Sequence, residues 1–412
     1  MKRSTTVFIL LLASLLIGAC NHTAPFPAVA KGPVILISID GFRWDYLQKY
    51  EAPTLKRLAA AGVHATRMTP SFPSKTFPNH YTLVTGLYPQ NHGIVANWFW
   101  DPAFGEMFNM SKLEEKWWSG GEPIWITAEK QGVRSACFFW PGSETPHGSV
   151  RATRSMPFNK KLTATQRVDG LLGWLDVPPA ERPRFLTLYF DHVDDAGHIF
   201  GPDAPETRAA VGEADEAIAR LLAGLTARGM REQTSFVIVS DHGMSECSPD
   251  RVIFFEDLMD TNTVQVESNG PNGGVRPKPG TMTPAELVAS IRAKAPPQLQ
   301  VYLREDVPAR LHYNRGERIP PVVLMADDGW NIESKIGWPR RAATYIRATH
   351  GWDPATSNMG ALFIATGPAF QRGVEIPDVA NIHVYNLLCA ALGITPAAND
   401  GDDRLVRAAL RK

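Results

Sequence analysis

Four short apolar runs, each followed by polar or charged residues, constrain the fold of this chain more than any other feature. The first run is Val34–Ile39, and the later ones cover residues 185–190, 236–240 and 361–365. Continuous apolar runs of this length are typical of central strands in a parallel sheet that is buried on both faces. Helical patterns at 54–61 and 207–227 lie between them. The sequence therefore predicts an α/β fold with a mostly parallel central sheet flanked by helices.

Carboxylate and imidazole side chains gather close behind these runs. The six candidates are Asp40, Asp194, His198, Asp241, His242 and His350, the last of which follows a strand-like run at 343–348. Ligands of open α/β folds bind at the carboxyl ends of the strands, where these side chains are expected to meet. Each residue alone has a structural explanation, such as a helix cap or a surface contact. Together they are the ligand types that suit zinc, and two groups of about three would form a two-metal phosphoryl-transfer centre.

A hydroxyl group is placed beside the same features by the segment TPSFPSKTFPNHYTLVTGLYPQNHGI at 69–94. Thr76 stands between a proline-rich loop and an apolar run that predicts a helix. Unpaired backbone N–H groups at a helix start attract phosphate. Threonine alone is a poor nucleophile, so it needs a metal or a base to activate it. We interpret Lys75 as solvated surface, with contact to phosphate as the alternative, and His80 and His92 as structural hydrogen-bonding residues.

The first 20 residues, MKRSTTVFILLLASLLIGAC, have the composition of a secretion signal. Lys2 and Arg3 supply the positive end, and the apolar stretch 7–16 is too short to span a bilayer. The last four letters resemble a bacterial lipobox, which predicts cleavage before Cys20 and a lipid on its thiol. The alternative is an ordinary signal with Cys20 incidental. We expect an exported protein, in the bacterial periplasm or anchored by this lipid to the cell-envelope membrane.

The rest of the chain is expected to form one domain over residues 33–412, after a tether at 21–32. We expect insertions around 98–160 and 244–345, the second forming a small subdomain, and a monomeric protein. The 42 basic residues balance the 42 acidic ones, which argues against a nucleic-acid polymer as partner. Three cysteines remain after Cys20, so a full disulfide framework is excluded, while a single bridge stays open.

Six sequence blocks carry a family resemblance. They are ISIDGFR at 37–43, the segment 70–94, the D-x-x-G-H pattern at 194–198, SDHGM at 240–244, HGWDPATSNMGALFIATGPAF at 350–370 and the tail at 381–401, which ends in LLCAALGITPAANDG. In these blocks the chain resembles a nucleotide pyrophosphatase/phosphodiesterase of the alkaline phosphatase superfamily. The resemblance runs from about residue 34 to residue 401. It implies an alkaline-phosphatase-like core.

The resemblance also implies roles for matching positions. One zinc ion would be held by Asp40, Thr76, Asp241 and His242, and a second by Asp194, His198 and His350. Thr76 would be the nucleophile, and the amide of Asn97 would donate to a phosphate oxygen. Phe77 and Tyr189 would sandwich a nucleobase, with Leu87 lining that pocket. The family motif usually carries Glu where this chain has Asp191, so that position receives no role.

The expected reaction is zinc-dependent hydrolysis of nucleotide diesters or pyrophosphates through a covalent threonine intermediate. It would release a nucleoside 5′-monophosphate. Aromatic residues around Thr76, with only one nearby cation, favour a diester with a planar base over a phosphate monoester. The alternative enzyme is a phospholipid or choline-phosphate diesterase of the lysophospholipase C type. A surface protein that binds such ligands without turnover is the non-enzymatic alternative.

Overall fold

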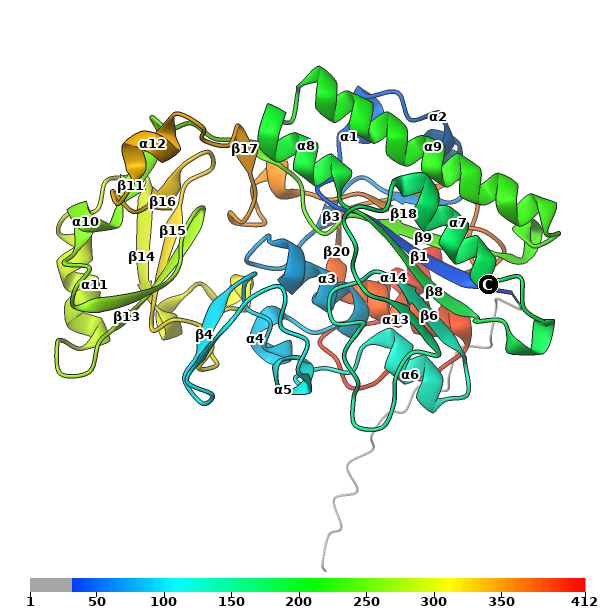
Figure 1. The fold of residues 1–412 in the computed structure, drawn as a ribbon, viewed down its shortest axis with the longest axis horizontal. Coiled ribbons are helices and arrows are strands. Elements are labelled where there is room, and N and C mark those ends of the chain that lie inside the picture. The colour runs from blue at the N-terminus through cyan, green and yellow to red at the C-terminus, as the bar shows by residue number, and fades with distance from the viewer. Residues whose placement is uncertain (1–31, 412) are drawn as a thin grey trace, which may run out of the picture.

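The computed structural model describes residues 32–411, which form an eight-stranded sheet between two layers of helices, with a smaller sheet beside it (Figure 1). The predicted signal sequence, and the tether apart from Gly32, lie outside these residues. In spatial order the large sheet contains β19 (Val374–Ile376), β2 (Val63–Ala65), β18 (Phe363–Thr366), β9 (Ser235–Val239), β1 (Val34–Ile39), β8 (Phe185–Phe190), β6 (Ser135–Phe138) and β7 (Arg154–Met156).

The centre of the sheet is parallel, as predicted. β1 lies between β8 and β9 and pairs with both in parallel, with Val34 opposite Phe185 and Ser235. Every residue of these three strands is buried. Because the three strands run in one direction, their carboxyl ends meet at one edge of the sheet. That edge carries Asp40 after β1 and Asp241 after β9.

Two of the predicted strands differ from expectation. β18 lies in the sheet but runs antiparallel to β9 and β2, with Phe363 beside Val239. The chain therefore enters β18 at the edge where β9 ends, and Thr366 lies toward the opposite edge. The strand expected at 343–348 is absent: residues 343 and 344 form a turn, and four of the six residues are exposed. Only β17 (Ala348–Thr349) is extended, and it pairs with β10 (Ser245–Glu246).

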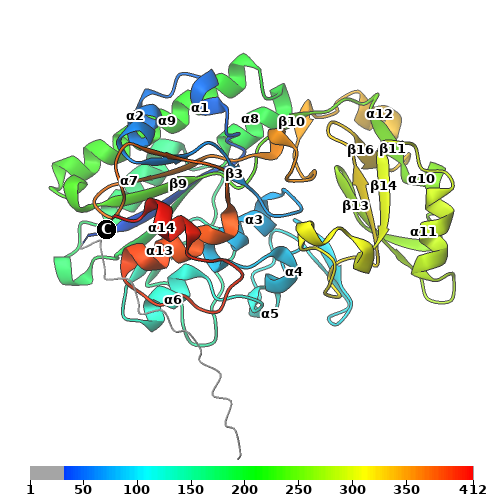
Figure 2. The ribbon, with the colours of Figure 1, turned by 180° about the vertical axis from the view of Figure 1, so that it is seen from behind.

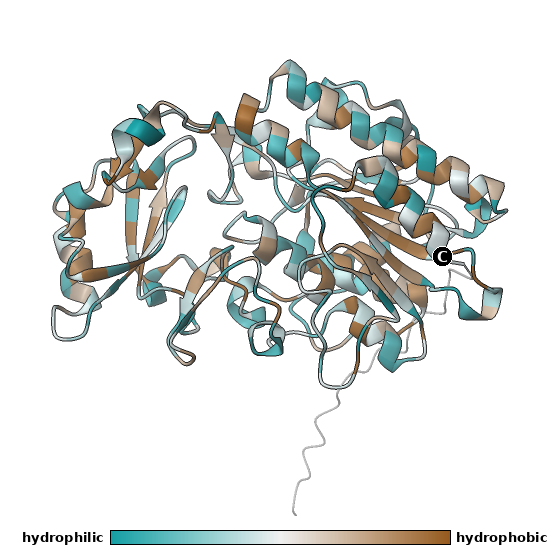
Figure 3. Ribbon diagram, viewed as in Figure 1, coloured by the Kyte–Doolittle hydropathy of each residue, from teal (hydrophilic) through white to brown (hydrophobic). Residues whose placement is uncertain are grey.

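Side chains of β1 alternate between two cores, which explains the two helical layers. Ile35, Ile37 and Ile39 pack with one layer, formed by α1 (Tyr46–Lys49), α2 (Pro53–Ala61), α7 (Ala164–Trp174), α8 (His192–Phe200) and α9 (Pro205–Ala227). Val34 and Leu36 pack with the other, formed by α3 (Thr76–Thr85), α6 (Ile124–Lys130), α13 (Val384–Leu392) and α14 (Arg404–Ala409). Figure 2 shows α13 and α14 over this second face. The strands between the layers are predominantly hydrophobic in Figure 3.

A smaller antiparallel sheet forms the subdomain. It contains β12 (Val264–Ser268), β13 (Asn272–Pro277), β15 (Val322–Ala326) and β14 (Leu299–Leu303), and α11 (Pro284–Arg292) packs on it around a separate hydrophobic core. This unit lies within the segment 244–345. The segment 98–160 is only partly an insertion, because β6 and β7 belong to the large sheet. Its remainder includes the hairpin of β4 (Phe99–Asp101) and β5 (Glu106–Phe108).

Two further properties follow from the residues in the structure. Cys137, Cys247 and Cys389 are buried free thiols, so the bridge left open by the sequence is not formed between them. Over residues 32–411, no helix combines the length and apolar character needed to cross a membrane.

Candidate two-metal active site

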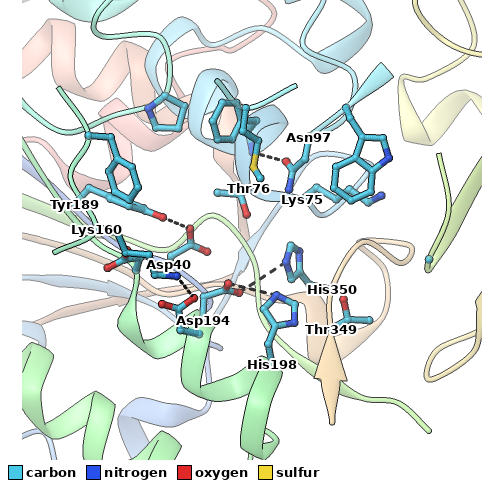
Figure 4. A pocket seen from close by; sticks show the side chains of 18 of the residues that line it. Asp40, Lys75, Thr76, Asn97, Lys160, Tyr189, Asp194, His198, Thr349 and His350 are labelled. Atoms are coloured by element: carbon cyan, nitrogen blue, oxygen red, sulfur yellow. Dashed lines mark hydrogen bonds and ion pairs between the residues drawn. The ribbon is translucent and has the colours of Figure 1, made fainter. Parts of the chain in front are cut away.

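A cavity of about 600 Å³ lies at the sheet edge where β1, β8 and β9 end. Its lining includes Asp40, Thr76, Asp194, His198 and His350. In Figure 4, Tyr189 and Lys160 lie on one side of Asp194, and His350 and Thr349 lie on the other. Segments far apart in sequence therefore meet at the place that the strand ends predicted.

The first ligand group consists of Asp40, Asp241 and His242, all buried. His242 Nε2 lies 2.9 Å from a carboxylate oxygen of Asp241 and 3.4 Å from one of Asp40. The hydroxyl of Thr76 lies 3.3 Å from the same nitrogen. The four side chains assigned to one zinc are thus brought together around one point.

The second ligand group consists of Asp194, His198 and His350, whose ligand atoms lie within 4.8 Å of one another. Asp194 and His198 are one turn apart on α8, with His198 Nε2 3.3 Å from a carboxylate oxygen of Asp194. His350 Nε2 lies 3.7 Å from the other oxygen. This group contains the three residues assigned to the second zinc.

Each of the three histidines is oriented by its Nδ1 atom. His198 Nδ1 lies 2.8 Å from the carbonyl oxygen of Ala348, and His350 Nδ1 lies 2.8 Å from that of Ser74. His242 Nδ1 lies 2.9 Å from the carbonyl oxygen of Gly243. A neutral imidazole that donates from Nδ1 presents an unprotonated Nε2, which is the form that binds a metal. All three Nε2 atoms face the carboxylates.

Unpaired carboxylate oxygens show that the site suits cations. One oxygen each of Asp40 and Asp194 is buried without a hydrogen-bond partner, and the buried Oδ2 atom of Asp241 has His242 Nε2 at 2.9 Å. Burial and the charges of Asp241 and Asp194 raise the pKa of Asp40 well above its usual value. Burial alone would lower the pKa of His198, but the Asp194 carboxylate outweighs it and raises the pKa to about 9. Such a concentration of buried negative charge needs a compensating charge, and its donors fit divalent metals such as zinc.

Thr76 is the first residue of α3, as predicted. The N–H groups of Thr76 and Phe77 have no partner within the helix, Pro78 has no N–H group, and the Asn79 N–H donates to the Lys75 carbonyl oxygen at 3.1 Å. One of these, the N–H of Phe77, donates to Asn97 Oδ1 at 2.9 Å. This bond fixes the carboxamide of Asn97, and since Asn97 lines the cavity, its NH₂ group is positioned to donate there.

Of the two residues near Thr76 interpreted from sequence, His80 agrees with the prediction and Lys75 does not. His80 is structural, as expected, with contacts of 2.8 Å to Ser38 Oγ and 2.9 Å to the Thr76 carbonyl oxygen. Lys75 is not solvated surface. It is 5% exposed, lines the cavity and lies over the ring of Trp98, and burial lowers its pKa to about 8.

The aromatic residues of the cavity differ from those named from sequence. Phe77 lines it, but Leu87 does not. Tyr189 also lines it, yet the residue is 9% exposed and its hydroxyl donates to Asp40 at 2.7 Å. A more accessible ring belongs to Phe158, which lines the cavity, is 51% exposed and lies edge-on to Tyr189.

Three exposed apolar residues of the cavity lining, Phe158 among them, could not be predicted from the sequence. Met110 and Leu113 also line the cavity with exposed side chains. All three come from segments without periodicity, so no pattern marked them. Asp191, to which no role was given, is paired with Arg167 at 2.9 Å.

Comparison with known proteins agrees with this geometry. Residues 34–353 match the sequence profile of the family described as type I phosphodiesterase / nucleotide pyrophosphatase. The chain belongs to this family. An uncharacterized pyrophosphatase/phosphodiesterase of Schizosaccharomyces pombe is 39% identical over 384 residues, covering 90% of this chain and 79% of that protein. Ectonucleotide pyrophosphatase/phosphodiesterase family member 3 of Mus musculus is 38% identical, covering 91% of this chain but 44% of its own length.

Solved structures of family members share the fold. Human ectonucleotide pyrophosphatase/phosphodiesterase 5 superposes with a TM-score of 0.87 at 34% identity, over 92% of this chain and all of that one. The murine protein, in an inactive variant with threonine replaced by alanine and in complex with AMP, gives a TM-score of 0.86 at 32% identity. These neighbours confirm the α/β, alkaline-phosphatase-like core.

Proposed function

We propose that this family member hydrolyses phosphate diesters and pyrophosphates of nucleotides and releases a nucleoside 5′-monophosphate. The observation that carries the proposal is the contact of the Thr76 hydroxyl, 3.3 Å from Nε2 of His242, which belongs to one of two adjacent groups of candidate metal ligands. The pyrophosphatase/phosphodiesterase names of the relatives support this reaction class, and the AMP complex of the murine neighbour supports a nucleotide substrate.

Two zinc ions per chain are part of the proposal. Asp40, Asp241, His242 and Thr76 would hold one of them. Asp194, His198 and His350 would hold the other. When bound, the ions supply positive charge that favours the deprotonated form of the threonine hydroxyl and stabilises the charge of the reacting phosphate.

The protein's own groups would then carry out the displacement. The Thr76 oxygen attacks phosphorus in line with the leaving oxygen, forming a phosphothreonine ester and releasing the leaving group. Water then attacks the same phosphorus from the vacated side, restores the Thr76 hydroxyl and releases the monophosphate. The Asn97 amide and the N–H group of Thr76 at the start of α3 would stabilise the non-bridging oxygens.

The nucleobase is assigned to the aromatic part of the cavity. Phe77 offers a ring next to the nucleophile, and Phe158 offers an accessible ring elsewhere in the lining. Stacking on such rings tolerates every base, because each base has a π-face. In this assignment Phe158 takes the place that the sequence gave to Tyr189, whose hydroxyl orients Asp40.

The location of the enzyme is a separate proposal. Its only support is the sequence at 1–20, which predicts export and a lipid on Cys20. Labelling of the expressed bacterial protein with a radioactive fatty acid, compared with Cys20→Ser, tests the lipid. Label that survives the substitution would contradict lipidation at Cys20.

A substrate panel tests the proposed reaction. Protein with measured zinc content is given p-nitrophenyl-thymidine 5′-phosphate, lysophosphatidylcholine and glycerophosphocholine. We expect the nucleotide ester to be cleaved with the highest kcat/KM. A higher kcat/KM on the choline esters would select the phospholipid or choline-phosphate diesterase instead. Failure to cleave any of the three would contradict the proposed diesterase activity.

A further inference from the structure

The edge of the large sheet opposite the active site carries a group of arginines. The parallel strands β1, β8, β9 and β6 all begin at this edge, at the right of the sheet in Figure 1, and β18 ends there. The segments that lead into or out of these strands carry Arg134 before β6, Arg182 and Arg184 before β8, Arg231 before β9, and Arg372 after β18. We call these five residues the arginine face.

Backbone contacts join these segments into one surface. The N–H of Arg184 donates to the carbonyl oxygen of Arg134 at 2.9 Å, so the loops before β6 and β8 are neighbours. The start of β1 bonds to the segments on both of its sides, with backbone hydrogen bonds of 2.7 and 2.9 Å. Arg231 and Arg372 line one hollow. The arginines therefore follow the order of the strands across the sheet edge.

The guanidinium groups of this face are accessible. Arg134 and Arg372 are exposed, and Arg182 and Arg231 are half-buried. Among residues 32–411, none of these four side chains lies within ion-pair distance of a carboxylate. Their charges are therefore available to an outside partner.

The carboxylates near this edge do not balance the arginines. Glu129 accepts hydrogen bonds from the chain around it, and Asp176 is paired with Arg228 at 2.7 Å. Glu181 and Glu232 are exposed. The arginine face, together with Arg228, outnumbers these carboxylates, so the edge carries net positive charge although the whole chain is balanced.

A hollow of about 460 Å³ opens in the arginine face. Its lining includes Arg231, Glu232, Thr366 and Arg372. The Arg231 guanidinium lies over the ring of Phe236, 5.3 Å from its centroid. Because guanidinium groups bind phosphate through parallel hydrogen bonds, the hollow has room and donors for a phosphate-bearing head group.

The chain enters the described structure at this same face. A Cβ atom placed on Gly32 would meet the carbonyl oxygen of Gln233 at 2.3 Å, so Gly32 packs against the loop that carries Arg231. Eleven residues, 21–31, separate it from Cys20 and can span at most about 40 Å. A lipid on Cys20 would therefore keep the arginine face within that distance of the membrane. The length of β1 places Asp40 about 20 Å farther along the strand direction.

We propose that the arginine face rests on the anionic surface of the membrane that holds the Cys20 lipid, with the active-site cavity opening away from that membrane. Basic residues near an anionic surface add to the hold of a lipid anchor. The enzyme would take soluble substrates from the aqueous side, and phospholipid head groups of the same membrane would face the opposite edge of the sheet. The orientation rests on the proposed location, whereas the charge of the face does not.

Vesicle binding tests the face separately from the lipid. The chain from residue 21 onward contains every element of the described structure and carries no lipid. We expect it to bind vesicles of equal parts phosphatidylglycerol and phosphatidylcholine, and not vesicles of phosphatidylcholine alone. The triple variant Arg134→Gln, Arg231→Gln and Arg372→Gln should bind the anionic vesicles about a hundredfold more weakly, about fivefold for each arginine.

A second triple variant is the matched control. Lys278→Gln, Lys294→Gln and Arg340→Gln change the net charge equally at exposed positions of the segment 244–345. Binding should stay within about threefold of the wild type, because charges far from the surface are screened. Both triple variants should keep Tm and the turnover of p-nitrophenyl-thymidine 5′-phosphate, since none of the six side chains lines the active-site cavity. Arg372→Glu alone should weaken binding more than about fivefold and covers the case in which the first triple variant fails to fold.

A fluorescent label tests the orientation. Nitrobenzoxadiazole is attached to Ala61→Cys, in the lining of the hollow, or to Ala343→Cys, beside the active-site cavity; both positions are exposed and the three native thiols of the described chain are buried. Anionic vesicles should raise the emission of the label at residue 61 and leave that at residue 343 unchanged.

Four results would overturn the inference. They are equal binding to both kinds of vesicle, equal losses in the two triple variants, a response of the label at residue 343 without one at residue 61, and binding of a single-stranded oligonucleotide without binding of vesicles, which would assign the face to a nucleic acid. Absence of a lipid on Cys20 would overturn the anchored orientation alone, and absence of turnover would overturn the proposed reaction alone, so each failure is distinguishable.

Discussion

The imidazole rings of His242 and His350 are stacked, with centroids 3.5 Å apart and planes 11° apart. Each ring belongs to a different ligand group, so this contact joins the two groups into one centre. Two imidazolium rings at this distance would repel each other. Burial and the His242 ring together hold the pKa of His350 well below its usual value, which keeps one of the pair neutral.

Zinc binding to this centre should release protons near neutral pH. In the metal-free protein the Asp194 carboxylate raises the pKa of His198 to about 9 against the effect of burial, so His198 carries a proton at pH 7.5. A metal must displace that proton. The affinity for zinc should therefore rise with pH, by about tenfold per unit for each proton released, until the pH passes about 9.

Calorimetry in two buffers of different ionisation enthalpy measures this release. We expect at least one proton per chain at pH 7.5 and a declining number as the pH approaches 9 and above. Zinc binding at pH 7.5 without net proton release would contradict the assigned protonation of His198.

The hydroxyl of Tyr189 should act on the first ligand group and not on the base. It donates to Asp40 at 2.7 Å, so Tyr189→Phe removes that bond and keeps the ring. Zinc affinity or kcat should fall about tenfold, the effect typical of losing such a supporting hydrogen bond, while KM for p-nitrophenyl-thymidine 5′-phosphate should stay unchanged. If Tyr189 served only as a stacking ring, the variant would match the wild type in zinc content and kcat.

Phe158 should contribute to binding of the nucleoside. Loss of a stacking ring costs about 1–3 kcal/mol per base, so Phe158→Ala should lower kcat/KM for the thymidine ester by about tenfold or more. On bis(p-nitrophenyl) phosphate, which has no base, the fall should be smaller. Phe104→Ala is a control, because Phe104 is 37% exposed but does not line the cavity. Equal losses on both esters would remove the base-binding role.

The ligand residues could be predicted from sequence because their positions follow from the strands. Asp40 comes directly after β1, Asp241 lies two residues after the end of β9, and the spacing of Asp194 and His198 fits one turn of helix. The direction of β18 could not be predicted, since an antiparallel central strand has the same apolar run as a parallel one. Phe158 was missed because its segment has no periodicity and its place depends on tertiary contacts.

The surroundings of two side chains near the nucleophile could not be predicted from the sequence. The sequence favours a solvated Lys75, yet the fold buries this side chain, and its ammonium group lies over the ring of Trp98. The resemblance gives Tyr189 a stacking role, and the structure adds a hydrogen bond from its hydroxyl to Asp40. Both side-chain positions depend on contacts between distant segments.

The most direct test of the central claim is turnover of p-nitrophenyl-thymidine 5′-phosphate by Thr76→Ala, measured together with the zinc content of the same sample. Thr76→Ser, which keeps a hydroxyl, is the matched control. We expect Thr76→Ala to lose turnover by at least about a thousandfold, the scale of losing a catalytic nucleophile, with zinc content near two per chain and Thr76→Ser retaining part of the activity. Turnover by Thr76→Ala near the wild-type rate would contradict the assignment of Thr76 as the nucleophile.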